Sequence, residues 1–397
     1  MSTERIARSG GKHVLLIVEN VPIARDHRLR KQVSALRQAG YRVSVICRSD
    51  PDNDDGRVGH GVRLYQYRAP ADAGSKLGYL WEYGYSWVMA ALLALRVFLT
   101  DRFDAIQISG TPDIYFAIGA VFRLFGAPLV LDQRDLTPDL YEMRYGRRDA
   151  MYRILRWFER HSYSAADRIV TVNGALRDMI RDRGGEATGE VTVVGNGPVL
   201  ARVRGHRPDP SLKDGKRYLC CWAGLMGPQD GLELVLPAIA ELPAPIRDEC
   251  RFVFIGDGEY RLVAESLAAE LGVSGAVEFT GWLPEPEVFG YLATADLGLE
   301  PNVHDIVSPV KGHEYMAFGV PYVAFDTEQT RVMSGPAACY AKRGEVTEFA
   351  NLIAKLLADD AARERMGRAG RERVERDLSW EHQQQAYLAM YRRLLGG

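Results

Sequence analysis

The alternation of short apolar runs with helical segments is the feature that most constrains how this chain can fold. His13–Val18 is expected to form a strand, and the apolar residues after it recur at helical spacing until Gly40. The alternation continues, with further strands expected at Arg42–Cys47, Val62–Tyr67, Ala105–Ile108, Leu129–Leu131, Arg168–Val172 and Val191–Val194. Strands separated by helices favour parallel pairing, so this half predicts an α/β domain with a doubly wound sheet.

A second series of the same kind follows a break in the pattern. Residues 198–216 are rich in proline, glycine and charge, which is typical of a linker. Strands are then expected at Tyr218–Ala223, Arg251–Ile255, Ala276–Phe279, Leu297–Leu299 and Pro321–Phe325. A chain of 397 residues is long enough for two such domains. We therefore expect one Rossmann-like domain at 1–200, a second at 201–377, and an amphipathic helix at 378–397 that packs back towards the first.

Composition and charge narrow the class of protein further. The formal net charge is -2, which gives no overall attraction to nucleic acid. The five cysteines form no C-x-x-C pair, which is typical of reduced thiols in a cytoplasmic protein. No apolar segment of the signal-peptide kind precedes the first strand. The longest apolar run, Trp87 to Leu99, contains Arg96 and is shorter than the ~20 residues that a membrane span needs.

Ligand sites are expected where parallel strands end. Open α/β sheets bind ligands beyond the carboxyl ends of their strands, so two such domains predict a site in a cleft between them. The turn Gly224 to Gly231 follows the strand Tyr218–Ala223 and precedes a helix. A glycine-rich turn of this kind lets backbone N–H groups approach an anion at the positive end of the helix. An ordinary tight turn is the alternative.

A second candidate is the helix that starts near Ser308. Ser308 suits the N-cap, Pro309 the first helical position, and Gly319 the C-terminal stop. The first turn carries Lys311, where a bound anion would offset the unfavourable meeting of lysine and helix dipole. Glu314 follows, and its carboxylate could accept both hydroxyls of a ribose. The alternative is an exposed Lys–Glu pair.

Charged residues also follow two strands of the first half. Asp26 and Arg28 lie in and after the loop that ends the first strand, and Arg134 and Asp135 follow Leu129–Leu131. These side chains could contact a charged or hydroxylated substrate, or they could belong to solvated loops. Asn196-Gly197-Pro198 has turn chemistry and could be a ligand contact or a plain interdomain turn.

At these motifs the chain resembles the retaining glycosyltransferases of family 4, which have the GT-B fold. The resemblance covers nearly the whole sequence. It is carried by Asp26 to Leu29, Gly40 to Val43, Asn196 to Pro198, Gly224 to Gly231, Phe254 to Gly258, and Glu314 to Gly319. The fold that it implies is α/β, with two Rossmann-like doubly wound domains facing across a cleft.

The resemblance implies an activity and a set of site residues. A sugar would pass with retention from a UDP- or GDP-linked donor to an acceptor, with no cofactor and no metal. The implied donor-binding residues are Gly224, Met226, Gly227, Gln229, Gly256, Asp257, Ser308, Pro309, Lys311 and Glu314. The implied acceptor-binding residues are Asp26, Arg28, Asp113 and Arg134, and the implied catalytic residues are Lys311, Arg134 and Asp135.

The chain departs from the family pattern in ways that leave alternatives open. Ile306 stands where the first glutamate of the usual Glu-x7-Glu pair is expected, and Gln133 begins a loop that is commonly His-His-Asp. A nucleotide-sugar epimerase and a non-catalytic donor-binding subunit are therefore alternatives. Arg261 replaces the third glycine of a dinucleotide fingerprint after Gly256, which disfavours an NAD oxidoreductase.

The sequence leaves the acceptor open between a lipid-linked or polysaccharide sugar and a soluble small molecule. Arginines cluster between Arg144 and Arg156 and between Arg25 and Arg30, and aromatic residues cluster between Tyr79 and Trp87. Such a surface could contact the inner face of a membrane as a peripheral protein. Solvated helix faces with a core aromatic stripe are the alternative.

Overall fold

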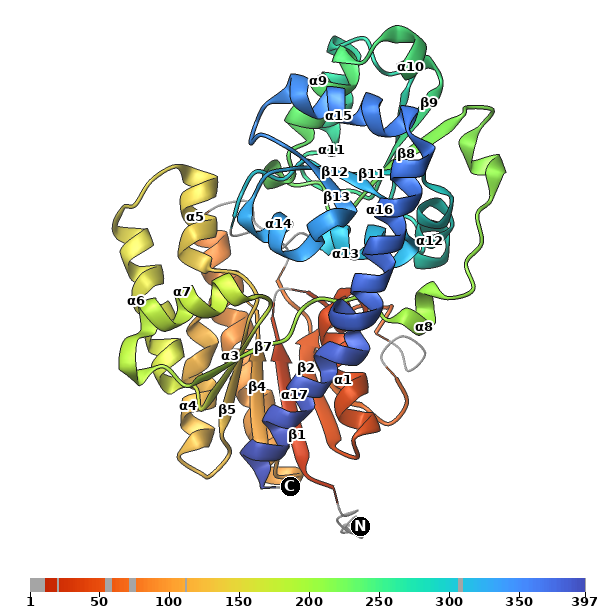
Figure 1. Ribbon diagram of the computed structural model, residues 1–397. Coiled ribbons are helices and arrows are strands. Elements are labelled where there is room, and N and C mark those ends of the chain that lie inside the picture. The colour runs from red at the N-terminus through yellow and green to blue at the C-terminus, as the bar shows by residue number, and fades with distance from the viewer. Residues whose placement is uncertain are drawn as a thin grey trace. The chain divides into compact units, whose positions relative to one another are not determined.

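The computed structural model describes residues 11–19, 21–53, 59–70, 76–110, 113–305 and 310–396. The chain divides into two compact units, Met1–Gly195 with Gln384–Gly397 (unit 1) and Asn196–Gln383 (unit 2). Each unit contains one parallel sheet with helices on both of its faces (Figure 1). The predicted pair of doubly wound α/β domains is therefore confirmed.

Unit 1 is built on a seven-stranded sheet in the order β3-β2-β1-β4-β5-β6-β7. Every neighbouring pair is parallel, and β1 pairs with both β2 and β4. The strand order therefore reverses between β1 and β4, which makes this the switch point of the sheet. The strands are β1 (His13–Val18), β2 (Arg42–Arg48), β3 (Arg63–Tyr67), β4 (Ala105–Ser109), β5 (Leu129–Gln133), β6 (Arg168–Thr171) and β7 (Glu190–Val193).

Helices cover both faces of this sheet. One face packs on α3 (Lys76–Thr100), α4 (Phe116–Arg123), α6 (Ala150–Ala165) and α7 (Gly174–Gly184), and the short helix α5 (Thr137–Tyr145) joins β5 to α6. The other face carries α1 (His27–Gln38) and the C-terminal part of α17 (Trp380–Leu395). The hydroxyls of Tyr387 and Tyr391 on α17 donate to Oε1 of Gln107 on β4, at 2.7 and 2.8 Å. The last helix is thus fixed to the first sheet.

Unit 2 repeats the plan with six strands in the order β10-β9-β8-β11-β12-β13. All neighbours are again parallel, and the switch point lies between β8 and β11. The strands are β8 (Tyr218–Ala223), β9 (Cys250–Ile255), β10 (Val277–Gly281), β11 (Leu297–Glu300), β12 (Tyr322–Phe325) and β13 (Ala338–Ala341).

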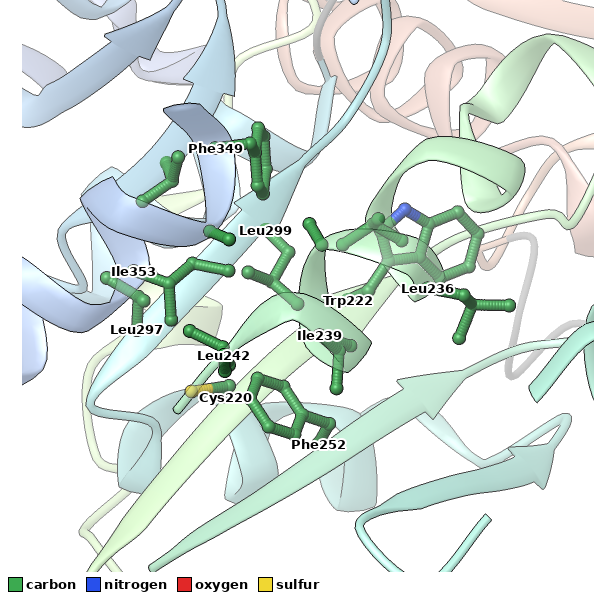
Figure 2. Packing of buried hydrophobic residues seen from close by; sticks show 14 of the residues in the cluster. Cys220, Trp222, Leu236, Ile239, Leu242, Phe252, Leu297, Leu299, Phe349 and Ile353 are labelled. Atoms are coloured by element: carbon green, nitrogen blue, oxygen red, sulfur yellow. The ribbon is translucent and has the colours of Figure 1, made fainter. Parts of the chain in front are cut away.

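The core of unit 2 has two layers, one on each side of the sheet. Figure 2 shows the layer in which Trp222 and Phe252 of the sheet pack with Leu236 and Ile239. Its helices are α9 (Leu232–Glu241), α11 (Arg261–Glu270) and α15 (Val346–Ala358), and a short helix, α10 (Ala244–Asp248), precedes β9. The opposite layer holds α12 (Glu285–Thr294), α13 (Val310–Phe318), α14 (Glu328–Ser334), α16 (Asp360–Arg373) and the π-helical turn η7 (Val374–Leu378).

Two expectations from the sequence need correction. Residues 198–216 are not a bare linker, because they form α8 (Leu200–Val203) and the 3-10 turn η4 (Pro210–Lys213), and Leu200 and Leu212 pack on the core of unit 2. The strand β13 was not expected, since its sequence Ala-Cys-Tyr-Ala lacks β-branched residues.

Helix α3 contains the apolar run Trp87 to Leu99 and extends well to its N-terminal side. By length and composition alone, its segment Trp81–Thr100 could cross a membrane, with a mean hydropathy of 1.3. One face of the helix nevertheless belongs to the core of unit 1, where Ala90, Ala94 and Val97 are fully buried. The opposite face exposes large apolar side chains, among them Leu92, Leu95 and Leu99.

Candidate functional site

The glycine turn of unit 2 lies at the switch point of its sheet. It leaves β8 at Gly224, forms the 3-10 turn η5 (Pro228–Asp230) and enters α9 through Gly231, whose φ of 74° is left-handed. The backbone N–H of Gly227 donates to Oδ2 of Asp230 at 3.1 Å, which fixes the shape of the turn. The side chain of Gln229 is half-buried, while Met226 is fully buried and anchors the turn in the core. The turn is therefore a rigid element at the edge where ligands of such sheets bind.

A second glycine loop packs directly against this turn. Gly256 follows β9 with φ 132°, and a Cβ atom there would lie 1.9 Å from the carbonyl oxygen of Gly224. A Cβ atom on Gly258 would lie 2.3 Å from the carbonyl oxygen of Met226. The backbone N–H of Met226 donates to the carbonyl of Asp257 at 2.9 Å. The two glycines thus let one loop backbone approach the other, and the half-exposed Asp257 side chain pairs with Arg261 at 3.7 Å.

Lys311 lies close to the glycine turn. Its Nζ atom is 2.8 Å from Oδ1 of Asp230 and 3.9 Å from Oε1 of Glu300, and it lies 4.8 Å from the centre of the Trp222 ring. The space for this side chain depends on Gly224, where a Cβ atom would meet Cε of Lys311 at 2.9 Å. The lysine is thus held at the switch point by two carboxylates and one indole.

The electrostatics of this cluster keep Lys311 charged. Burial alone would lower the pKa of Lys311, but the carboxylates of Glu300 and Asp230 raise it above its ordinary value. Glu300 ends β11 and is only 1% exposed, and burial raises its pKa. Neither oxygen of Glu300 has a hydrogen-bond partner among the described residues. The site thus combines a buried cation with a carboxylate that has spare hydrogen-bonding capacity.

The rest of α13 fixes where Lys311 and Glu314 lie. The hydroxyl of Tyr315 donates to the carbonyls of Cys221 on β8 and Leu299 on β11, at 3.1 and 3.0 Å. The helix is thereby fastened across the switch point, and Gly319 ends it as expected, with φ 71°. Glu314 is half-buried and close enough to Lys311 to raise its pKa. Ser308 and Pro309 lie outside the described residues.

In unit 1 the charged residues singled out in the sequence meet around one buried carboxylate, Asp132 at the end of β5. Arg28 donates to Asp132 at 2.8 Å, and Arg134 donates to it at 3.0 Å. Arg134 also pairs with Asp26 at 2.6 Å, while Asp26 caps α1 through the N–H of Leu29. Burial would raise the pKa of Asp132, but the two arginines lower it to about 2. The four charges thus largely satisfy one another.

Of the other expected residues of unit 1, Asp135 adjoins this network, since Arg134 and Arg28 act on its pKa, while Asp113 lies in a separate turn. Asp135 is exposed, and its backbone carbonyl accepts from Nε2 of Gln133 at 2.7 Å. Asp113 begins the 3-10 turn η2 (Asp113–Tyr115) beyond β4 and is 4% exposed. Burial raises the pKa of Asp113 to about 6. The side chains of Thr137 and Gln133 lie close enough to this carboxylate to lower its pKa in part.

The Asn196-Gly197-Pro198 turn has a structural role. A Cβ atom on Gly197 would lie 1.7 Å from the carbonyl oxygen of Leu378, and the N–H of Trp380 donates to the carbonyl of Pro198 at 2.9 Å. The turn therefore packs, backbone to backbone, on the segment that leads into α17.

Sequence reasoning missed four residues that hold these clusters together: Trp222, Asp230 and Glu300 around Lys311, and Asp132 between the arginines. For two of them a signal was available. Asp132 and Glu300 are charged residues at the ends of otherwise apolar strands, a position where burial is costly unless the charge is used.

Two separate parallel sheets, each with the strand order described above, are typical of proteins with the GT-B fold. Sucrose-phosphate synthase from Thermosynechococcus elongatus aligns over 97% of this chain and 99% of its own, with a TM-score of 0.78 at 17% identity. HepE from Anabaena in complex with UDP-glucose aligns over 96% of this chain and 99% of its own, with a TM-score of 0.72 at 16% identity.

The family follows from the sequence. Residues 26–197 match the family model of the glycosyl transferase 4-like domain, and residues 204–373 match that of the glycosyl transferases group 1. The two matches take in most of the chain, which belongs to the group 1 glycosyltransferases. A curated relative, 2-deoxystreptamine glucosyltransferase from Streptomyces kanamyceticus, is 30% identical over 177 residues, 44% of this chain. The match spans 45% of that relative, less than half of its length.

Proposed function

We propose that this protein moves a sugar from a nucleotide diphosphate sugar to a hydroxyl of an acceptor, with retention at the anomeric carbon. The observation that carries the proposal is the position of Lys311, a charged ammonium held against a glycine turn at the switch point of unit 2. An ammonium and the N–H groups of such a turn are the groups that a leaving diphosphate needs. Membership of the group 1 glycosyltransferases supports the same reaction class.

In the proposed reaction, the bond between the anomeric carbon and the diphosphate oxygen breaks, and a bond from that carbon to the acceptor oxygen forms. The electron pair of the broken bond stays on the diphosphate, which also takes the proton of the acceptor hydroxyl. Lys311 would stabilise the charge that develops on the diphosphate. A preorganised donor of this kind contributes ~2.7–4 kcal/mol in a site that excludes water.

The remaining donor contacts follow from the same edge of unit 2. Glu314, close to Lys311, would accept the hydroxyls of the ribose. The loop at Gly256 and Asp257 would lie near the base, and the backbone at Ser308 and Pro309 would help to bind the phosphates. The UDP-glucose in the HepE complex and the glucosyl transfer named for the Streptomyces relative make UDP-glucose the first donor to test, with GDP-linked sugars as the alternative.

On the acceptor side, the network of unit 1 suggests a division of roles. Arg134 is the residue that we place nearest the acceptor, because it lies at the carboxyl edge of the sheet and is less buried than Arg28. Arg28 is 6% exposed and holds Asp132, so we propose that it positions Arg134. Asp26 would also position Arg134, through its ion pair with that residue. Asp135 is exposed and would contact an acceptor that arrives from solvent.

The proposed function is tested by binding and by release of the nucleotide. A thermal-shift series with UDP, GDP, UDP-glucose and GDP-mannose should show one nucleotide raising the Tm, since a ligand at 100 times its Kd adds ~2.7 kcal/mol. Release of that nucleotide only when an acceptor is present supports transfer. A donor that is isomerised without any release of nucleotide would indicate an epimerase instead. Binding with no turnover under any acceptor would indicate a donor-binding subunit.

We also propose that unit 1 contacts an anionic membrane through the outer face of α3. Leu92, Leu95 and Leu99 are 57%, 47% and 74% exposed, at helical spacing on one face. The end of α4 continues this apolar face, because Phe125 is 56% exposed and its ring lies 5.8 Å from Phe98 on α3. The exposed Arg96 adds the positive charge that anionic lipids attract.

Co-sedimentation with vesicles tests this contact. The protein should pellet with vesicles that contain phosphatidylglycerol and stay in solution with pure phosphatidylcholine. Leu95→Glu should abolish pelleting, whereas Glu328→Gln, at an exposed position at the start of α14, should not affect it. Concentration-dependent dimers that Leu95→Glu dissociates, without any vesicle binding, would show that the face binds a second copy instead. The membrane proposal places the protein in the cytoplasm, on the inner face of the membrane.

A further inference from the structure

Four buried polar side chains lie together in unit 1. They are Glu19 just after β1, Tyr67 at the end of β3, Ser86 on α3 and Tyr115 in η2, exposed by 3%, 3%, 0% and 2%. Both carboxylate oxygens of Glu19 and all three hydroxyls lack a hydrogen-bond partner among the described residues. Because a buried polar group without a partner destabilises the fold, four of them from four separate segments need an explanation.

These groups lie close together. The hydroxyls of Ser86 and Tyr115 both lower the pKa of Tyr67, and the Ser86 hydroxyl lowers that of Glu19, whose pKa burial raises to about 7. On the solvent side of the cluster, Arg48 forms an ion pair with Glu82 at 2.9 Å. The cluster therefore adjoins an ion pair whose arginine is partly exposed.

The position of the cluster in the sheet is that of a ligand site. Glu19 follows β1 and Tyr115 follows β4, the two strands between which the strand order reverses. Unit 2 has Gly224 and Glu300 at the corresponding strand ends, β8 and β11. Ligands of doubly wound sheets bind at this point. The two units thus each have a polar cluster at the switch point of their own sheet.

The chemistry of the cluster selects the class of ligand. Asp113 begins the turn that contains Tyr115, but its carboxylate interacts with the side chains of Thr137 and Gln133 and is not part of the cluster. The cation that lowers the pKa of Glu19 is Arg48, and it is already paired with Glu82 at 2.9 Å. Carboxylates accept hydrogen bonds, and hydroxyls both accept and donate them. Such a set suits hydroxyl and ammonium groups and disfavours phosphates and carboxylates.

We infer that Glu19, Tyr67, Ser86 and Tyr115 form an acceptor subsite for a polyhydroxylated amine, such as an amino sugar or an aminocyclitol. The inference rests on the proposed function, because it names the class of acceptor for that reaction. An ammonium group of the ligand would pair with Glu19. The hydroxyl groups of the ligand would form hydrogen bonds with the hydroxyls of Tyr67, Ser86 and Tyr115.

Binding of three probes tests the inference independently of turnover. Saturation-transfer NMR and thermal shift are measured with glucosamine, glucose and glucose 6-phosphate on the full chain. The affinity should fall in that order. No binding of glucosamine, or tighter binding of glucose 6-phosphate than of glucosamine, would overturn the inference.

Variants separate a binding role from a merely structural one. Glu19→Gln and Tyr115→Phe should each weaken glucosamine binding about tenfold, the effect of one lost hydrogen bond to a charged or buried partner. Glu19→Gln should also raise the Tm near neutral pH, because it removes a buried charge. A cluster that only supports the fold would show the reverse, a lower Tm with unchanged glucosamine binding. Glu328→Gln, at an exposed position at the start of α14, is the matched control and should change neither quantity.

Nucleotide binding keeps the two proposals apart. UDP or GDP should bind the Glu19→Gln and Tyr115→Phe variants as well as the unchanged protein, because these residues lie in unit 1. If the nucleotide binds and glucosamine does not, the acceptor subsite is wrong and the proposed function stands. If no nucleotide binds the unchanged protein, the proposed function itself fails.

Discussion

The Nζ atom of Lys311 lies 2.8 Å from Oδ1 of Asp230, although the two residues are 81 positions apart in the sequence. Asp230 belongs to the glycine turn after β8, and Lys311 belongs to the helix after β11. The ion pair therefore ties together the two segments that leave the switch point of unit 2. A diphosphate bound at the turn would compete with Asp230 for an ammonium that is already in place.

Replacement of the proposed ribose ligand should weaken nucleotide binding. Glu314→Gln keeps the size of the side chain but removes its charge, so binding should weaken by ~1.5–3 kcal/mol, the value of a hydrogen bond to a charged group. Calorimetric titration of the variant with UDP and GDP measures the loss. An unchanged Kd for both nucleotides would remove Glu314 from the site.

The contact between the two glycine loops can be tested at Gly256. Gly256→Ala places a Cβ atom 1.9 Å from the carbonyl oxygen of Gly224, at a φ of 132°. The backbone must shift or remain strained, at a cost of roughly 1–3 kcal/mol, and both the Tm and the affinity for the nucleotide should fall. Gly275→Ala is the control, since a Cβ atom there meets open space. Equal Tm values for the two variants would show that the close approach is not rigid.

The buried carboxyl of Glu19 predicts a pH dependence of stability. Its pKa is raised from an ordinary 4.5 to about 7, so the folded protein binds this proton more tightly than the unfolded chain does. The stability that the proton contributes is complete below about pH 4.5 and is lost as the pH rises through about 7. Glu19→Gln should therefore be more stable than the unchanged protein at alkaline pH, by up to ~3 kcal/mol, and should lose this advantage in acid.

Thermal unfolding of both proteins at about pH 5 and about pH 8 measures this difference, with the transition of unit 1 followed separately if the two units unfold apart. A variant that is less stable at both pH values would contradict the assignment of a raised pKa to Glu19.

Removal of metal ions should leave the reaction unchanged. In the proposed site, Lys311 and backbone N–H groups neutralise the negative charge of the diphosphate, so no divalent cation is required. We expect the rate of nucleotide release in EDTA to equal the rate in added Mg²⁺. A loss of activity in EDTA that Mg²⁺ or Mn²⁺ restores would show that the account of the diphosphate site is incomplete.

Local sequence signals explain what could be predicted of this protein. Apolar runs such as His13–Val18 and Tyr218–Ala223 form strands with the expected limits, because their pattern and the turns around them agree. Lys311 was predicted as a site residue because its place in a helix start is visible in the sequence. The strand β13 was missed, because its pairing with β12 rather than its own composition makes it a strand.

Contacts between distant segments explain what could not be predicted. Asp230 and Glu300 acquire their role from Lys311, and no spacing in the sequence links the three. Arg28 and Arg134 were expected to face a substrate, yet both turn towards Asp132, which lies just before Arg134 in the chain. The switch-point cluster of Glu19 and Tyr115 likewise forms only when β1 and β4 become neighbours.

The role of Lys311 is best tested by the kinetics of two variants. Lys311→Ala should lower kcat/KM for release of the nucleotide from its donor by roughly 10²–10³, as for the loss of one preorganised donor. Because this change also leaves Glu300 buried without its cation, the double variant Lys311→Met with Glu300→Gln serves as the control for local destabilisation. We predict the same loss of kcat/KM in both variants, with the Tm restored in the second. Unchanged kcat/KM in Lys311→Ala, or recovery of activity in the double variant, would contradict the central claim that Lys311 neutralises the diphosphate.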